Sequence, residues 1–281
     1  MDYSLDIKNK VAVVTGAGGV LCSMFAATLA EQGAKVALLD LNKDNAEKYA
    51  SEIRAKGFEA KAYGCNVLKK DSLEEAHQAI LQDLGPCDIL INGAGGNNAR
   101  AQTTKEYYEV GDEDLEGIVS FFELDQSGVE FVFNLNFIGT LLPTQVFAKD
   151  MIGREGCSIV NISSMNAYTP LTKIPAYSGA KAAVSNFTQW MAVHFSKVGI
   201  RVNAIAPGFF VTKQNQALLF NEDGTPTART GKILAATPMG RFGKPEELNG
   251  TLLHLVNEKA SGFITGVVIP IDGGFSAYSG V

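Results

Sequence analysis

The sequence is poor in the residues that build disulfide frameworks and metal sites. It has only four cysteines and three histidines among 281 residues. Cys22, Cys65, Cys87 and Cys157 are scattered without CxxC or metal-like spacing, and no histidine has a second candidate ligand beside it. We therefore predict buried, reduced thiols and no metal site, and a disulfide-rich scaffold is excluded.

Basic clusters and long apolar runs are also missing. The formal net charge is −6 and the pI is near 5.2, which disfavours nucleic acid as a partner. The N-terminal segment MDYSLDIKNK has no apolar signal core, and no uninterrupted apolar run reaches the ~18 residues of a membrane span. We expect a cytoplasmic protein that binds neither nucleic acid nor membrane.

The sequence does contain a regular alternation of apolar, strand-like runs with helix-like segments. Such alternation is typical of a parallel sheet covered by helices on both faces. It predicts an α/β fold of the Rossmann type, a doubly wound parallel sheet in a single domain that spans residues 1–281. The strand-like runs lie at 11–15, 35–40, 58–67, 87–93, 157–164, 199–208 and 266–274.

Two long segments, 96–127 and 209–241, interrupt this alternation. Both follow predicted strands, and ligands of doubly wound sheets bind beyond the carboxyl ends of the strands. Long excursions from a compact domain are commonly functional. We interpret 96–127 as an insertion and 209–241 as a loop, both covering a substrate; the alternatives are an oligomer contact or a disordered loop.

A glycine-rich turn, TGAGGVLCS (15–23), directly follows the first predicted strand and opens a helix. Glycines at this place let backbone N–H groups approach a pyrophosphate at the positive end of the helix. Asp40 ends the second strand, ~20 residues further on, where a carboxylate can receive ribose hydroxyls. No arginine follows Asp40 to accept a 2′-phosphate, so NAD(H) is favoured over NADP(H). The alternative is that Asp40 only caps the next helix.

Three residues in SSMNAYTPLTKIPAYSGAK (163–181) suit proton transfer to or from an alcohol or ketone. Tyr177 and Lys181 are spaced i and i+4, one turn apart on the same face of a helix, and Pro175 suits the first turn of that helix. An ammonium near a phenol favours the phenolate and lowers its pKa. The hydroxyl of Ser164 can hold the substrate oxygen beside the phenol.

Five motifs in this order resemble the short-chain dehydrogenase/reductase family, from about residue 9 to residue 275. They are TGAGG (15–19), NGAG (92–95), which is close to the family's Asn-Asn-Ala-Gly, Asn136 in NLNFIGT, the set of Ser164, Tyr177 and Lys181, and Pro207-Gly208. The resemblance implies that Tyr177 is the general acid/base, Ser164 orients the carbonyl, Lys181 lowers the Tyr177 pKa and holds the nicotinamide ribose, and Asn136 anchors a water. The cofactor-binding residues that it implies are Gly16, Gly18, Gly19, Val20, Leu21, Asp40, Asn66, Val67, Asn92, Gly93, Ala94, Gly95, Tyr177, Lys181, Pro207, Gly208, Phe210 and Thr212.

The chain departs from the family pattern at three further positions. Val20 and Cys22 occupy the places of the second and third glycines of TGxxxGxG, and Asn66 replaces the usual aspartate after strand three. We expect altered packing at the pyrophosphate turn and retained NAD binding.

Within the family, blocks such as TGxGGVLCS, INGAGGN and APGFFxTKQN are similar to those of bacterial D-mannonate oxidoreductases, also called fructuronate reductases. The resemblance implies interconversion of D-mannonate and D-fructuronate. A sugar acid needs hydrogen-bonding side chains and a cation, for which the candidates are Asn97, Asn166, Lys173, Lys213 and Gln214, although a solvated surface role is open for each. The alternatives are an oxidoreductase of another polyol, sugar or keto acid, of gluconate or sorbitol type, and a catalytically silent NAD(H)-binding regulator.

The resemblance also implies a homotetramer. Segments 129–142 and 186–195 are the candidate contacts, and burial within one subunit is the alternative.

Overall fold

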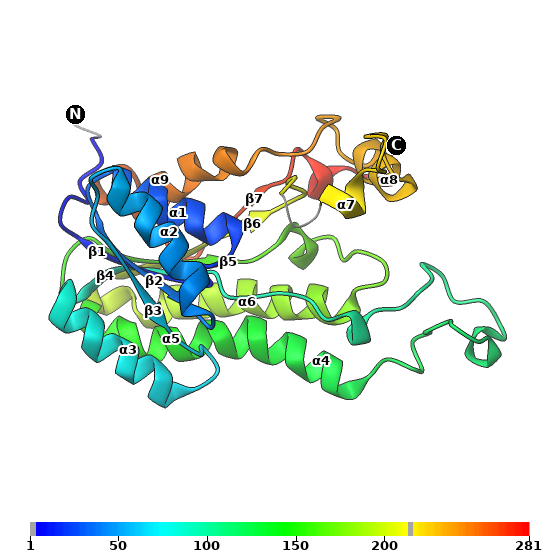
Figure 1. Cartoon of the computed structure of the whole chain (residues 1–281), viewed down its shortest axis with the longest axis horizontal. Coiled ribbons are helices and arrows are strands. Elements are labelled where there is room, and N and C mark those ends of the chain that lie inside the picture. The colour runs from blue at the N-terminus through cyan, green and yellow to red at the C-terminus, as the bar shows by residue number, and fades with distance from the viewer. Residues whose placement is uncertain (1–3, 213–215, 281) are drawn as a thin grey trace.

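The computed structural model describes residues 4–212 and 216–280, and within them seven strands form one parallel sheet in the order β3-β2-β1-β4-β5-β6-β7 (Figure 1). The chain builds outward from β1 through β2 and β3, then returns to β1's other side for β4, so a switch point lies at the carboxyl ends of β1 and β4. The predicted Rossmann-type fold is confirmed. The strands are β1 (Val11–Thr15), β2 (Lys35–Asp40), β3 (Ala60–Gly64), β4 (Cys87–Asn92), β5 (Cys157–Ile162), β6 (Ile200–Pro207) and β7 (Val268–Ile271).

Helices cover both faces of the sheet (Figure 1). One layer contains α1 (Val20–Glu31), α2 (Lys43–Ala55) and α9 (Asn249–Val256), and the other contains α3 (Lys70–Asp83), α5 (Gly139–Met151) and α6 (Pro175–His194). Each layer has its own apolar core because alternate strand residues point to opposite faces: Ala12 and Val14 of β1 pack in the first, Val11 and Val13 in the second. Burial on both faces explains why the strands read as continuous apolar runs.

Local sequence signals set several helix ends. Pro175 is the first residue of α6, as predicted, where its missing N–H is not needed. Asn42 caps α2, since its side-chain oxygen accepts hydrogen bonds from the backbone N–H groups of Asp44 and Asn45. Asp40 is therefore not the cap of this helix.

A continuous helix from Gln126 to Met151 comprises α4 (Gln126–Phe133), a π-helical turn (Asn134–Ile138) and α5. By length and composition it could cross a membrane, but half of its most apolar stretch is buried inside the protein, where α5 packs on β4 and α3. In the sequence, asparagines and threonines interrupt the apolar runs of this stretch.

The two excursions lie at the same end of the molecule as the carboxyl ends of the strands (Figure 1). Segment 96–125 reaches beyond the start of α4 and contains two short 3₁₀ turns. The second excursion contains α7 (Gln216–Leu219) and α8 (Ala228–Ala235), and α10 (Glu258–Ser261) precedes the last strand.

Candidate active site

The glycine turn packs closely against two neighbouring segments. Gly16 has a φ of +67°, and a Cβ atom there would lie 2.9 Å from the Cα of Ala94. A Cβ atom at Gly18 would lie 2.8 Å from the carboxylate of Asp40, which accepts a hydrogen bond from the Gly18 N–H at 2.9 Å. Only glycine fits these positions. The turn, the N-terminus of α1 and the Asp40 carboxylate therefore form one compact unit that fits the pyrophosphate and ribose of a dinucleotide.

Two departures from the family pattern compensate each other. A Cβ atom at Gly93 would lie 2.1 Å from the Sγ of Cys22. The family's usual asparagine at position 93 would collide with this thiol, and its usual glycine at position 22 would leave the space empty. Val20 begins α1 and is partly exposed. The packing here thus differs locally from the family pattern: α1 carries a larger side chain, Cys22, and the end of β4 carries a smaller residue, Gly93.

The strand-four motif is anchored to β1. The backbone N–H groups of Gly93 and Ala94 both donate to the Oγ1 of Thr15, at 3.0 and 3.2 Å. The Asn92 side chain is buried, and its Nδ2 donates to Thr144 and Asn161 at 2.9 Å each. This amide ties β4 to α5 and β5. The predicted contact of Asn92 with a cofactor therefore falls to its backbone and stays a prediction.

Asn136 lies in the π-helical turn and is fully buried. Its Nδ2 donates to the backbone carbonyls of Val132 and Gly96, each at 2.7 Å, and its Oδ1 accepts from the Gly96 N–H at 3.3 Å. A Cβ atom at Gly95 would lie 2.7 Å from this Oδ1 and 3.1 Å from the Nζ of Lys181. The helix, the strand-four motif and Lys181 therefore meet at one point.

Ser164, Tyr177 and Lys181 come together as predicted. Ser164 follows β5 and its Oγ contacts the Tyr177 phenol, while Tyr177 and Lys181 lie one turn apart on α6. The Lys181 ammonium is 5.7 Å from the centre of the Tyr177 ring and donates to the carbonyl of Ile162 at 2.7 Å. A proton donor, a hydroxyl and a buried cation thus share one site at the sheet's carboxyl edge.

Burial dominates the acid–base properties of this pair. It raises the pKa of Tyr177, and the hydrogen bond with Ser164 opposes the rise. Burial also lowers the pKa of Lys181 to about 8, with the neighbouring Cys22 opposing the shift. Burial thus favours the neutral phenol, the form that donates a proton. That Lys181 lowers the Tyr177 pKa stays a prediction.

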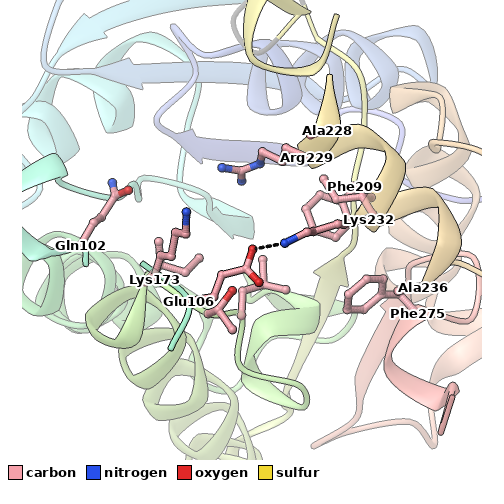
Figure 2. Close-up of a pocket in the computed structure, with 13 residues that line it drawn as sticks. Gln102, Glu106, Lys173, Phe209, Ala228, Arg229, Lys232, Ala236 and Phe275 are labelled. Carbon is pink, nitrogen blue, oxygen red and sulfur yellow. Dashed lines mark hydrogen bonds and ion pairs between the residues drawn. The ribbon is translucent and has the colours of Figure 1, made fainter. Parts of the chain in front are cut away.

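A pocket of about 400 Å³ lies beside the start of α6 (Figure 2), a size usual for small-molecule sites. Its walls are the insertion, the loop 171–174 that leads into α6, and α8, with the rings of Phe209 and Phe275 on one side. The two excursions therefore meet across this pocket. Phe209 follows Pro207-Gly208, and Ile174, which also lines it, precedes Tyr177 by three residues.

Four charged residues line this pocket: Glu106, Lys173, Arg229 and Lys232, a net charge of +2. Lys173 was predicted from the sequence. Its backbone φ of +70° is unusual for a residue with a side chain and costs about 1–3 kcal/mol, and residues strained in this way cluster at functional sites. The carbonyl of Lys173 accepts from the Thr103 N–H at 3.0 Å, which ties the loop to the insertion. Sequence reasoning missed Arg229 and Lys232 because they resemble ordinary solvated cations on a short helix.

The remaining predicted residues have varied positions. Asn66 accepts a hydrogen bond from the Leu68 N–H, and the ring of Phe210 packs in the core against Gly243, which leaves only its backbone for a cofactor. Asn166 is buried and Asn97 is exposed; neither lines the pocket. Their contacts with substrate stay predictions, as do the cofactor contacts of Leu21, Val67, Pro207, Gly208 and Thr212, while Lys213 and Gln214 lie outside the described residues.

The family model for short chain dehydrogenases matches residues 10–223. An uncharacterized oxidoreductase of Haemophilus influenzae is 62% identical over 277 residues, which are 98% of this chain and 96% of that protein. A crystal structure from Haemophilus influenza with bound NAD, of a protein provisionally named D-mannonate oxidoreductase, has a TM-score of 0.95 at 62% identity and covers 99% of both chains. Gluconate 5-dehydrogenase of Gluconobacter oxydans is 33% identical over 265 residues, 94% of each chain.

The matched residues include the glycine turn, the strand-four motif, Asn136, Ser164, Tyr177 and Lys181. The fold, the site geometry and these relatives agree. The chain belongs to the short-chain dehydrogenase/reductase family and is an oxidoreductase.

Proposed function

We propose that the protein uses NAD(H) to interconvert a secondary alcohol and a ketone on a sugar acid, with D-mannonate and D-fructuronate as its substrates. The observation that carries the sugar acid is the pocket of net charge +2 beside the start of α6, in a chain whose net charge is −6. NAD(H) is supported by the Asp40 carboxylate at the glycine turn, which would repel a 2′-phosphate.

In the direction of reduction, the neutral phenol of Tyr177 donates its proton to the carbonyl oxygen as that oxygen gains charge. The Ser164 hydroxyl hydrogen-bonds the same oxygen and orients it. Lys181 stabilises the tyrosinate that results and binds ribose hydroxyls, and a water held at Asn136 returns a proton to Tyr177. NAD(H), when bound, supplies or accepts the hydride.

Two other functions remain as rivals. The first is oxidation or reduction of another polyol, sugar or keto acid, which the similarity to a gluconate 5-dehydrogenase favours. The second is a catalytically silent NAD(H)-binding regulator, which the joined Asn136, Ser164, Tyr177 and Lys181 set disfavours, because a binding-only protein does not need a proton donor.

One assay separates the three functions. The rate of NADH consumption is measured with D-fructuronate, with 5-keto-D-gluconate and with D-fructose, at equal concentrations. We expect kcat/KM to be highest with D-fructuronate. A preference for another substrate supports the first rival, and tight NADH binding without turnover of any of them supports the regulator.

We further propose a cytoplasmic homotetramer. Trp190 and Val193 of α6 and Phe131 and Phe133 of α4 are exposed apolar side chains within the two candidate contact segments. Light scattering should give four times the subunit mass, and Trp190→Glu should lower it; a monomeric wild type would contradict the proposal.

A further inference from the structure

The charged residues of the pocket divide into a closed ion pair and two open cations. Glu106 and Lys232 form the pair, with Nζ and Oε1 2.7 Å apart, and Lys232 holds the pKa of Glu106 below its usual range. This pair joins the insertion to α8 across the pocket (Figure 2). Because its charges cancel, the positive charge of the pocket belongs to the other two residues.

Arg229 and Lys173 are those two open cations. In the part of the chain that the structure describes, neither forms an ion pair, although Lys173 lies near enough to Glu106 to contribute to the lowered pKa of that carboxyl. Figure 2 shows their head groups reaching from α8 and from the loop before α6 toward the space between these elements. Two segments far apart in sequence thus aim unpaired positive charge at one space.

We infer that Arg229, assisted by Lys173, binds the carboxylate of the substrate, an inference that rests on the proposed function. A guanidinium matches a carboxylate through two parallel hydrogen bonds, whereas an ammonium acts as a point charge. Lys173 lies in the loop that leads into α6, the helix that carries Tyr177. A carboxylate bound by Lys173 and Arg229 is therefore positioned relative to the proton donor. Glu106 and Lys232 fix the spacing of the two walls.

The direct test is binding of D-mannonate to the NADH-loaded enzyme, a pair that cannot react. Calorimetric titration should give a Kd that rises by roughly 10- to 100-fold in Arg229→Gln, the size of a lost charge-assisted pair. Arg229→Lys should recover part of this loss. Arg54→Gln, which removes the same charge from an exposed ion pair with Glu47 on α2, is the matched control and should bind like the wild type.

Two further measurements sharpen the test. D-mannitol has the polyol chain without the carboxylate, so its affinity should be weak and equal in the wild type and Arg229→Gln. The double variant Glu106→Gln/Lys232→Gln keeps the net charge of the pocket and should lose less affinity for D-mannonate than Arg229→Gln. Unchanged D-mannonate binding in Arg229→Gln, or a larger loss in the double variant, overturns the assignment.

Failure of the subsite differs from failure of the proposed function. If the wild type binds D-mannonate through Arg229 but does not reduce D-fructuronate, the subsite stands and the proposed reaction is wrong. If the wild type reduces D-fructuronate while Arg229→Gln binds D-mannonate equally well, the reaction stands and the subsite is wrong.

Discussion

At the scale of single residues, Cys22 and Gly93 occupy one small space beside the glycine turn. The sequence reveals both as departures from the family, but it does not reveal that they touch, because the contact joins α1 to the end of β4. The exchange accounts for a cysteine at the position of the third family glycine.

The pair yields a double-mutant prediction. Gly93→Asn alone should lower the free energy of unfolding by about 1–3 kcal/mol, since the new side chain overpacks against the Cys22 thiol. Adding Cys22→Gly should recover most of this loss, which urea denaturation of the four proteins measures. Strictly additive effects would show that the two residues do not share this space.

The burial of Lys181 should make the free energy of unfolding depend on pH. Its pKa is about 8 in the folded protein against 10.5 ordinarily, so between these values the unfolded chain binds more protons and the wild type gains stability as pH rises. Lys181→Met lacks this group. At pH 7 this variant should have the higher free energy of unfolding. The difference from the wild type should shrink by up to about 3 kcal/mol between pH 8 and 10.5.

Chemical denaturation of both proteins across this range measures the difference, in which the other titrating groups largely cancel. A gap that stays constant or widens with pH would contradict burial of the ammonium.

At the scale of elements, the π-helical turn between α4 and α5 determines where Asn136 lies. A π turn in an α-helix is uncommon and is often found at functional sites. Here its asparagine reaches back to the carbonyl of Val132 and across to Gly96. Pro175 indicated the start of α6 in the sequence. The residues NLNFI (134–138) contain no signal that distinguishes a π turn from an ordinary α-helix.

Asn136→Ala should therefore loosen the strand-four motif. We expect a loss of about 1–3 kcal/mol in unfolding free energy and faster deuterium exchange in residues 93–97, because the Gly96 N–H and carbonyl lose their partner. Thr140→Val, which removes one hydrogen bond to the Asn136 carbonyl in the same helix, is the control. Unchanged exchange in 93–97 would contradict this anchoring role.

At the scale of the whole molecule, the order of strands brings residues from distant segments to one edge of the sheet. The alternation of apolar runs was enough to predict this architecture, because parallel strands end at a common edge. The pairing of Ser164 with Tyr177 was predicted from their motif and from the resemblance to the family. Arg229 was not predictable from the sequence: it follows a polar segment, 221–226, and only the meeting of α8 with the insertion places it at the pocket. The fold and the residues for proton transfer can thus be predicted from sequence patterns. The residues that would bind the charged group of the substrate cannot, because their position depends on how the insertion packs against α8.

The central claim is that Tyr177 passes the proton during turnover of a sugar acid. It is tested by comparing Tyr177→Phe with the wild type in two measurements, NADH consumption with D-fructuronate and NADH affinity by fluorescence titration. We predict that turnover falls by at least about a hundredfold while NADH affinity is nearly unchanged, since only the phenolic hydroxyl is removed. Turnover close to that of the wild type in Tyr177→Phe would contradict the account.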